Sequence, residues 1–301
     1  MTEEAAQALT CSIGIFTYNE AGNILKLLDA LANQDLKEVK IREIIVVSSA
    51  STDGTDELVE AHAASHPLVR LIRQAKREGK SSAINIFLKE ATSDILVVIS
   101  GDVIPERHTI RRLVSAFSNP KVGATGGRPV PVNDTSSFMG YSVHLFWRLH
   151  HRMALISPKL GEMIAFRKLM DSIPKDSAVD EASIEAIVRQ HKLELRYIPE
   201  AIIRNKGPEN LRDFVKQRRR IQNGHLWLKA RQNYTVSSQS GSTLFRILLE
   251  EALEYPLCIP KIIVVMGMEV YCRILGSIDF YLRKKNPFAW EIARSTKDLS
   301  K

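Results

Sequence analysis

Residues 95–106 read ILVVISGDVIPE, in which five apolar and mostly β-branched residues run directly into Ser100-Gly101-Asp102. A short continuous apolar run of this kind is typical of a strand buried on both faces. An aspartate just beyond such a strand has two interpretations. It is either a turn residue that bonds its own backbone or a ligand for a divalent cation.

The same alternation of apolar strand and polar loop recurs through the first 120 residues. We expect strands at 11–16, 43–47, 68–72 and 95–99, and helices at 20–33, from about 53, and at 81–91. Alternating strands and helices predict an α/β fold with a mostly parallel sheet flanked by helices. In such sheets ligands bind beyond the carboxyl ends of the strands, here followed by the polar loops TYNE, SSASTDGT, QAKREGKSS and SGDV. Ser51 or Thr52 is expected to cap the helix that begins near Asp53.

The second half of the chain is less regular. The Gly/Pro-rich stretch 123–132 predicts a loop or an edge strand, and 195–203 predicts a strand interrupted by Pro199. Helices are expected at 136–155, 183–190 and 211–228, the last strongly basic. The first of these helices carries His144, His150 and His151, and we expect it to lie at a surface rather than to supply a metal site.

The net charge of +8 over 301 residues favours an anionic partner such as a phosphorylated substrate, a nucleic acid or a membrane surface. Aromatic residues do not interleave with the basic runs as base-stacking platforms would, so nucleic acid is not the expected partner. The three cysteines have no metal-type spacing and predict a reducing compartment. The acidic N-terminus lacks the apolar segment of a signal peptide, and we expect a cytoplasmic protein.

Two further groups of charged residues are candidates for chemistry. Lys76, Arg77 and Lys80 surround a glycine just before a helix, and both the cations and the helix N-terminus favour bound phosphate. Asp180 and Glu181 open a later helix. They either stabilise that helix end or accept a proton from an attacking hydroxyl.

Six motifs occur in a characteristic order: TYNEAGNI, VVSSASTDGT, REGKSSAIN, ILVVISGDVIPE, VDEASIEA and QRRRIQNG. Together they resemble the family 2 inverting glycosyltransferases, which have the GT-A fold, over about residues 10–230. The resemblance implies a hexosyltransferase-type enzyme that moves a sugar from a nucleotide-sugar donor to a lipid-linked or saccharide acceptor.

The resemblance also implies how the donor is bound. Thr17, Asn19 and Glu20 would line the base and ribose, and Ser49 stands where the family usually has a nucleotide-binding aspartate. Lys80 would approach the diphosphate.

The Ser-Gly-Asp turn occupies the place of the family's D-x-D motif. Asp102 matches the last aspartate, which ligates Mg²⁺ or Mn²⁺, and Ser100 replaces the first. One carboxylate, phosphate oxygens and waters can complete the coordination of either ion.

For catalysis, the resemblance implies Glu181 as the base, with Asp180 as its close rival. Gln217 and Arg220 match the family's Q-x-x-R-W block on the donor side, while isoleucine replaces the tryptophan. Arg218 and Arg219 are expected on an exposed helix face. The segment 161–163 matches a loop that shapes the acceptor pocket.

We expect a GT-A domain at 1–235, with a nucleotide-binding half at about 10–120 and an acceptor half at 121–235. Residues 236–301 predict a helical, apolar and membrane-associated tail. Its segment 262–278 contains Glu269 and Arg273, which are spaced to pair along one helix face. Three interpretations stay open for it: a helix lying on a membrane or a partner, a membrane span, or a buried helical pair.

Two alternatives to a glycosyltransferase also stay open. A nucleotidyltransferase shares a related sheet and metal–diphosphate site, but FTYNEAGN is not its glycine-rich basic loop. A non-catalytic nucleotide-sugar-binding protein is compatible with the missing acids in SSASTDGT and SGD.

Overall fold

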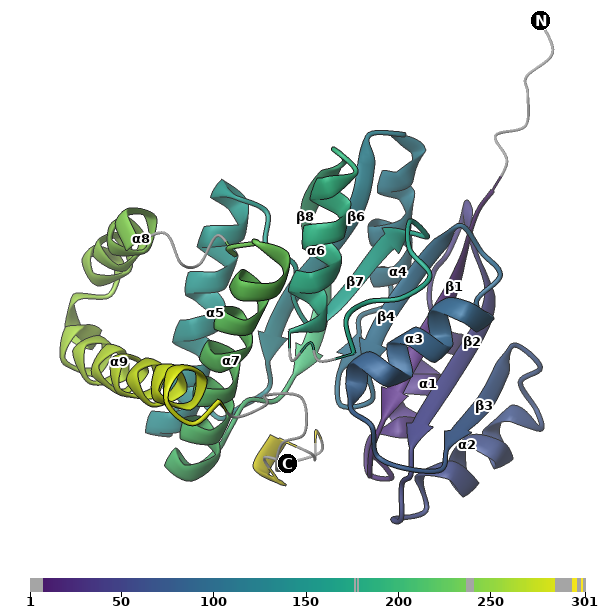
Figure 1. Cartoon of the computed structure of the whole chain (residues 1–301), viewed down its shortest axis with the longest axis horizontal. Coiled ribbons are helices and arrows are strands. Elements are labelled where there is room, and N and C mark those ends of the chain that lie inside the picture. Colours follow the sequence, from purple (N-terminus) through teal and green to yellow (C-terminus); the bar gives the residue numbers. More distant parts are fainter. Residues whose placement is uncertain are drawn as a thin grey trace, which may run out of the picture.

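The computed structural model describes residues 8–175, 177, 179–236, 241–284, 294–296 and 299. Strands and helices alternate through the first half as the apolar pattern predicts (Figure 1). The elements of this half are β1 (Leu9–Thr17), α1 (Ile24–Ala32), β2 (Val39–Ser49), α2 (Thr55–Ala63), β3 (Val69–Gln74), α3 (Lys80–Glu90), β4 (Ile95–Ser100), β5 (Ile104–Pro105) and α4 (Thr109–Ser115).

The second half adds three strands and a group of longer helices. They are β6 (Val122–Pro131), α5 (Phe138–Ile156), β7 (Met163–Arg167), α6 (Asp180–Gln190), β8 (Glu194–Asn205), α7 (Leu211–Gln232), α8 (Gly241–Glu254) and α9 (Ile259–Tyr281), with 3₁₀ turns at Ala116–Ser118, Pro256–Cys258 and Arg294–Thr296.

All described strands join one sheet in the order β3-β2-β1-β4-β7-β6-β8-β5. The pairs among β3, β2, β1 and β4 are parallel, and β6 is parallel to β8, whereas β7 is antiparallel to both of its neighbours. The stretch 123–132 is therefore neither a loop nor an edge strand, because β6 lies inside the sheet. Its ladder with β8 shifts register between Gly127 and Arg128, opposite the segment that contains Pro199.

Helices cover both faces of the sheet. Apolar side chains of α1, α2 and α4 form one core cluster with alternate residues of β1 and β4. Those of α3 and α6 form a second cluster on the opposite face. This two-sided burial explains why β4 is apolar at every position before Ser100.

The C-terminal helices form an additional layer outside the sheet (Figure 1). Helix α5 packs against β6 and α8, and α9 packs along α7. A third apolar cluster joins α5, α8 and α9. The histidine-bearing helix is thus covered on more than one side, rather than lying at the surface. Within the described ranges, no helix combines the length and apolar character needed to cross a bilayer.

Candidate active site

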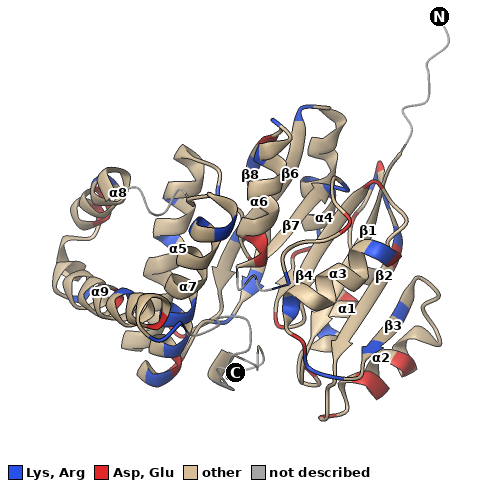
Figure 2. Ribbon diagram, viewed as in Figure 1, with Lys and Arg blue, Asp and Glu red and all other residues tan. Residues whose placement is uncertain are grey.

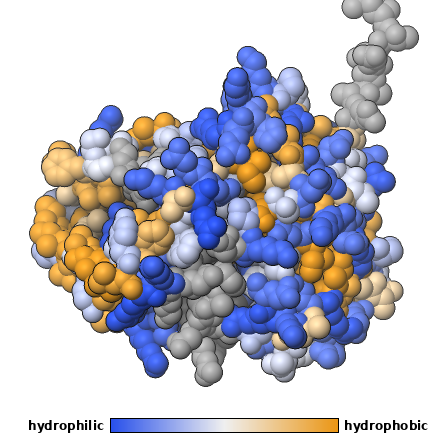
Figure 3. All heavy atoms as spheres, in the orientation of Figure 1, coloured by the Kyte–Doolittle hydropathy of each residue, from blue (hydrophilic) through white to orange (hydrophobic). Residues whose placement is uncertain are grey.

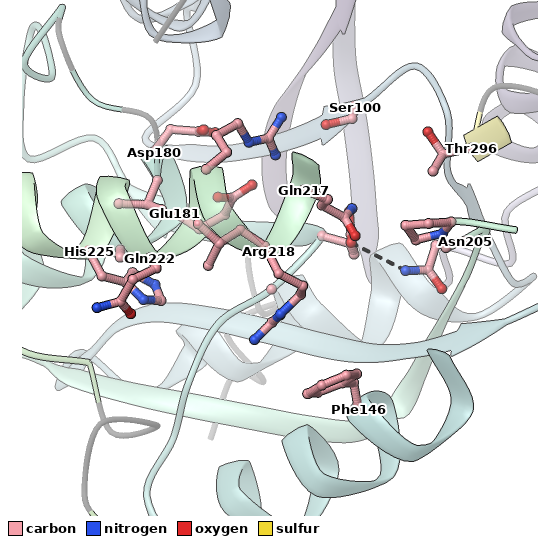
Figure 4. A pocket seen from close by; sticks show the side chains of 18 of the residues that line it. Ser100, Phe146, Asp180, Glu181, Asn205, Gln217, Arg218, Gln222, His225 and Thr296 are labelled. Carbon is pink, nitrogen blue, oxygen red and sulfur yellow. Dashed lines mark hydrogen bonds between the residues drawn. The ribbon is translucent and has the colours of Figure 1, made fainter. Parts of the chain in front are cut away.

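The carboxyl ends of β1, β2 and β4 open into one cavity of about 1000 Å³, which continues between α5, α6 and α7. The cavity collects nearly all of the residues that the sequence singles out. Those lining it are Thr17, Glu20, Ser49, Lys80, Ser100, Asp102, Asp180, Glu181, Gln217 and Arg220. Several of them are seen from close by in Figure 4.

The first two loops are tied to each other. The Asn19 side chain does not line the cavity; its Oδ1 accepts a hydrogen bond from the backbone of Thr52 at 2.8 Å. Asp53 accepts hydrogen bonds from the backbone N–H groups of Ala21 (3.0 Å) and Thr55 (3.1 Å). The expectation that Ser51 or Thr52 caps the following helix is wrong, because α2 begins at Thr55 after a glycine.

Short polar side chains line the cavity at the ends of β1 and β2. Thr17 is buried, and its Oγ1 has no hydrogen-bond partner among the described residues. The Ser49 hydroxyl donates to Gln74 at 2.5 Å at the end of β2. A buried hydroxyl without a protein partner is suited to bind a polar ligand group.

Gly101 lets the β4 turn pass close to the first loop. A Cβ at this position would lie 2.9 Å from side-chain atoms of both Thr17 and Glu20. This close approach leaves Ser100 and Asp102, on either side of the glycine, in the cavity wall. Burial raises the pKa of the Asp102 carboxyl, while the positive charges of Lys80 and then Arg220 oppose the change.

Lys80 joins the two halves of the site. Its Nζ lies 2.7 Å from Asp180 Oδ2 and 2.8 Å from Glu181 Oε1, across 100 residues of sequence. Burial disfavours the ammonium, but the two carboxylates outweigh it and raise the pKa of Lys80. The first residue of α3 is therefore held against the first turn of α6. Figure 2 shows the acidic start of α6 in red near the middle of the molecule.

The two clamped carboxylates differ in access. The side chain of Glu181 is 25% exposed and that of Asp180 is 5% exposed, so Glu181 is the more accessible of the two from the cavity. Burial opposes ionisation of both. The Lys80 charge prevails at Glu181 and lowers its pKa, whereas the added repulsion from Glu181 leaves the pKa of Asp180 raised.

The three consecutive arginines of α7 have three different environments. Arg218 donates two hydrogen bonds of 2.7 Å to Glu269, and Arg219 pairs with Asp279, both on α9. The expectation that these two arginines form an exposed face is therefore wrong. Arg220 points to the site, where burial lowers its pKa against the opposing field of Asp180 and other carboxylates.

Sequence reasoning placed Glu162 within the segment 161–163 but did not single out its carboxylate. Glu162 accepts a hydrogen bond from Asn205 at 3.2 Å, and burial followed by repulsion from Asp102 and Glu181 raises its pKa to about 7. Glu162 directly precedes β7, whose antiparallel direction brings its starting end to the cavity edge. The loops after strands mark the other candidate residues, whereas Glu162 stands before its strand.

The charges of the site match a divalent cation. Among the described residues, four carboxylates lie together here: Asp102, Glu162, Asp180 and Glu181. The cations whose charges lower their pKa values are Lys80 and, for Asp102 and Glu181, also Arg220. This excess of hard oxygen donors fits Mg²⁺ or Mn²⁺. In the part of the chain that the structure describes, no three histidine, cysteine or carboxylate side chains form a ready metal cluster. An ion at Asp102 would take its other ligands from a diphosphate and from water.

Comparison with known proteins identifies the class to which this fold and site belong. Residues 12–192 match the model of Glycosyl transferase family 2, and this match covers more than half of the chain. The chain therefore belongs to glycosyl transferase family 2. Its mixed sheet flanked by helices is the GT-A fold that the sequence motifs predict.

Two curated relatives match part of the chain. Glycosyltransferase AglE from Haloferax volcanii is 31% identical over 116 residues, 38% of this chain and 38% of AglE. A dolichol-phosphate mannosyltransferase from Pyrococcus furiosus is 35% identical over 119 residues, 40% of this chain and 33% of the relative. The chain thus spans well under two thirds of the length of either relative.

Solved structures share the fold at low sequence identity. A mannosyltransferase from Pyrobaculum calidifontis in complex with GDP-Man and Mn²⁺ has a TM-score of 0.67 at 22% identity, covering 91% of this chain and 88% of that one. Glucosyl-3-phosphoglycerate synthase from Mycobacterium tuberculosis, solved with Mn²⁺ and UDP, has a TM-score of 0.52 at 18% identity, covering 76% and 82%.

Proposed function

We propose that this protein is a metal-dependent inverting glycosyltransferase that moves a sugar from a nucleotide-sugar to a lipid-linked or saccharide acceptor. The proposal rests on one cavity that is lined by Asp102 and by Asp180 and Glu181, whose carboxylates both contact Lys80. The donor side supplies a cation ligand, and the opposite side supplies a carboxylate that a hydroxyl can reach. In this proposal residues 1–235 are the catalytic domain, with a nucleotide-binding half at about 10–120 and an acceptor half at 121–235, and 236–301 are a helical, apolar, membrane-associated tail.

The donor would lie along the strand ends. Thr17, Glu20 and Ser49 line the part of the cavity assigned to the base and ribose, and Asn19 holds the loop that carries them. Ser100 and Gln217 also face this space.

Asp102 would hold Mg²⁺ or Mn²⁺ together with the diphosphate, and the ion would neutralise charge on the leaving group. The support for a metal is the carboxylate-rich wall, together with the Mn²⁺ named for the two structural neighbours. Arg220, and the ammonium of Lys80 between its two carboxylates, would add positive charge near the same phosphates.

The acceptor hydroxyl would lose its proton to Glu181 while its oxygen bonds to the anomeric carbon. The bond from that carbon to the diphosphate breaks on the opposite face, which inverts the configuration. Because the pKa of Glu181 is lowered, this carboxylate is ionised at neutral pH and able to accept the proton. Asp180 is the alternative base, although its side chain is less accessible.

The test is a donor screen with intact-mass detection of the product, with and without Mn²⁺. Glu181→Gln should lower kcat by about 10²–10⁴-fold while nucleotide binding persists. If Asp180→Asn abolishes turnover and Glu181→Gln does not, the two carboxylates exchange roles. Nucleotide binding without any transfer would favour the non-catalytic alternative, and transfer of a nucleotidyl group would favour a nucleotidyltransferase.

We also propose that α8 and α9 lie on the cytoplasmic face of a membrane. The inward faces of the two helices carry charged groups: the carboxylates of Glu251 and Glu269 are buried against arginines of α5 and α7. The outward residues of these helices and of their flanking turns are largely apolar (Figure 3). The exposed ones include Phe245, Leu249, Leu253, Leu257, Ile263, Val264, Val270, Tyr271, Ile274, Tyr281 and Leu282. Exposed basic side chains such as Arg246 and Arg283 accompany them.

An apolar outer face with basic residues is suited to an interface rich in anionic lipids. The lipid surface would remove the apolar face from water while the basic groups meet the headgroups. Vesicle binding tests this assignment directly.

A further inference from the structure

The cavity extends beyond the residues that the proposed reaction uses. Its second part, which we call the inner chamber, lies between α5, α7, α8 and α9. The apolar and aromatic side chains that line it are Phe146, Trp147, Leu149, Met153, Leu244 and Met266. Several of these belong to the cluster that binds the C-terminal helices to α5. The tail thus builds one wall of the chamber.

The inner chamber also contains cations. Arg218 and Arg273 both donate to Glu269, at 2.7 Å and 2.8 Å, so that one carboxylate serves two guanidiniums. Burial opposes ionisation of Glu269, but the two arginines outweigh it and lower its pKa to about 2. The carboxylate is fully ionised, and the trio keeps one net positive charge.

A third cation lines the same chamber. Burial lowers the pKa of Lys159 to about 8, with Glu185 opposing the change. Burial also raises the pKa of Glu185 to about 7, although its Oε1 accepts the backbone N–H of Leu160 at 2.7 Å. Arg218, Arg273 and Lys159 act on one another here, and these three cations outnumber the two carboxylates that oppose them, Glu185 and Glu269.

Two partly buried histidines lie near these cations. Burial is the main cause that lowers the pKa of His225 to about 3, and the positive charges of Lys159 and Arg218 add to it. Burial, again followed by Lys159, lowers the pKa of His150 to about 3. Both imidazoles are neutral at physiological pH. The chamber therefore presents apolar walls around a region of excess positive charge.

We propose that the inner chamber binds the phosphate-bearing head of a lipid-linked acceptor, with the lipid chain directed between α5, α8 and α9. This proposal rests on the proposed function and narrows its acceptor class. A free saccharide needs neither the apolar wall nor the cations, whereas an anionic amphiphile uses both. The chamber is continuous with Glu181, so the saccharide end of the same acceptor can present its hydroxyl to that carboxylate.

Binding of dodecyl phosphate to the 301-residue protein, at concentrations below those at which the detergent forms micelles, tests the proposal. Dodecyl maltoside supplies a similar chain without the phosphate, and inorganic phosphate supplies the head without the chain. We expect dodecyl phosphate to bind at least tenfold more tightly than either, with a change in the fluorescence of Trp147. Lys159→Met should remove most of this preference. Lys89→Met, at an exposed lysine on α3, should keep it.

The same samples are titrated with nucleoside diphosphate and Mn²⁺. If nucleotide binds but dodecyl phosphate shows no preference over the two probes, the chamber proposal is overturned and the proposed function stands. If dodecyl phosphate is preferred but no nucleotide binds, the proposed function fails instead. Should Lys159→Met not fold, Arg273→Met, whose side chain is 37% exposed, replaces it with the same expectation. If the variant that folds still binds dodecyl phosphate more tightly than the two other probes, the proposal is also overturned.

Discussion

Replacing Glu269 with glutamine should loosen α9 from α7, because this carboxylate is the partner of Arg218 from α7 and of Arg273 from its own helix. Glu269 is 3% exposed, so water screens these pairs little. Glutamine keeps the size of the side chain but leaves two guanidiniums without their anion. The change therefore tests charge rather than packing.

The magnitude follows from the pKa of Glu269, which lies at about 2 instead of 4.5 because the two arginines outweigh the effect of burial. One pKa unit corresponds to about 1.4 kcal/mol, so the carboxylate contributes about 3 kcal/mol at neutral pH. Because the pKa is lower in the folded protein, this contribution is complete above about pH 4.5 and is lost as the pH falls towards 2. The stability gap between wild type and Glu269→Gln should close in that window.

Urea denaturation at pH 7 and pH 3 measures the gap, and amide hydrogen exchange of Ile259–Tyr281 shows whether α9 is the part that loosens. Glu250→Gln is the matched control, since Glu250 and its partner Arg246 are 41% and 73% exposed. That exposed pair should contribute less than about 1 kcal/mol. If Glu269→Gln costs no more than the control, buried ion pairs do not hold the tail and our reasoning is wrong.

Burial raises the pKa of Glu185 to about 7, so its contribution to stability is present below about pH 4.5 and is lost as the pH rises through 7. Between pH 4.5 and 8 the stability of wild type relative to Glu185→Gln should fall by roughly 3 kcal/mol in urea denaturation. Leu257→Ser removes a side chain that is 95% exposed, and sedimentation with anionic vesicles should show about tenfold weaker binding. Leu68→Ser, at an exposed leucine before β3, should change nothing, and equal loss in both variants would contradict the membrane assignment. Gly127→Ala would place a Cβ 2.4 Å from the carbonyl oxygen of Ala201 and should cost about 1–3 kcal/mol by thermal unfolding. A melting temperature equal to that of wild type would show that β6 and β8 can separate there.

The sequence predicts the first half of the fold well because its signals are local. Apolar strands and amphipathic helices alternate there, and polar loops follow each strand. The inner position of β6 could not be predicted, because its glycines weaken the strand pattern. Those same glycines admit close neighbours, since a Cβ at Gly126 would lie 2.8 Å from Leu160. A packing reason of this kind is invisible in a single sequence.

Contacts between segments far apart in the sequence could not be predicted either. The sequence marks Lys80 and the Asp180-Glu181 pair as separate candidates, but nothing in their spacing predicts that they bind each other. Likewise, the arginines of α7 look solvated until α9 brings Glu269 and Asp279 to them. Charged residues are assigned to solvent by default, and only tertiary structure shows which are neutralised.

The proposed reaction depends on a cation that Asp102 binds and that in turn binds the diphosphate of the donor. A crystal soaked with Mn²⁺ and a nucleoside diphosphate, measured for manganese anomalous scattering, tests this interaction. We expect an anomalous peak in contact with an Asp102 carboxylate oxygen and with phosphate oxygens. Bound nucleotide with no manganese beside Asp102, or with that side chain turned out of the cavity, would contradict it.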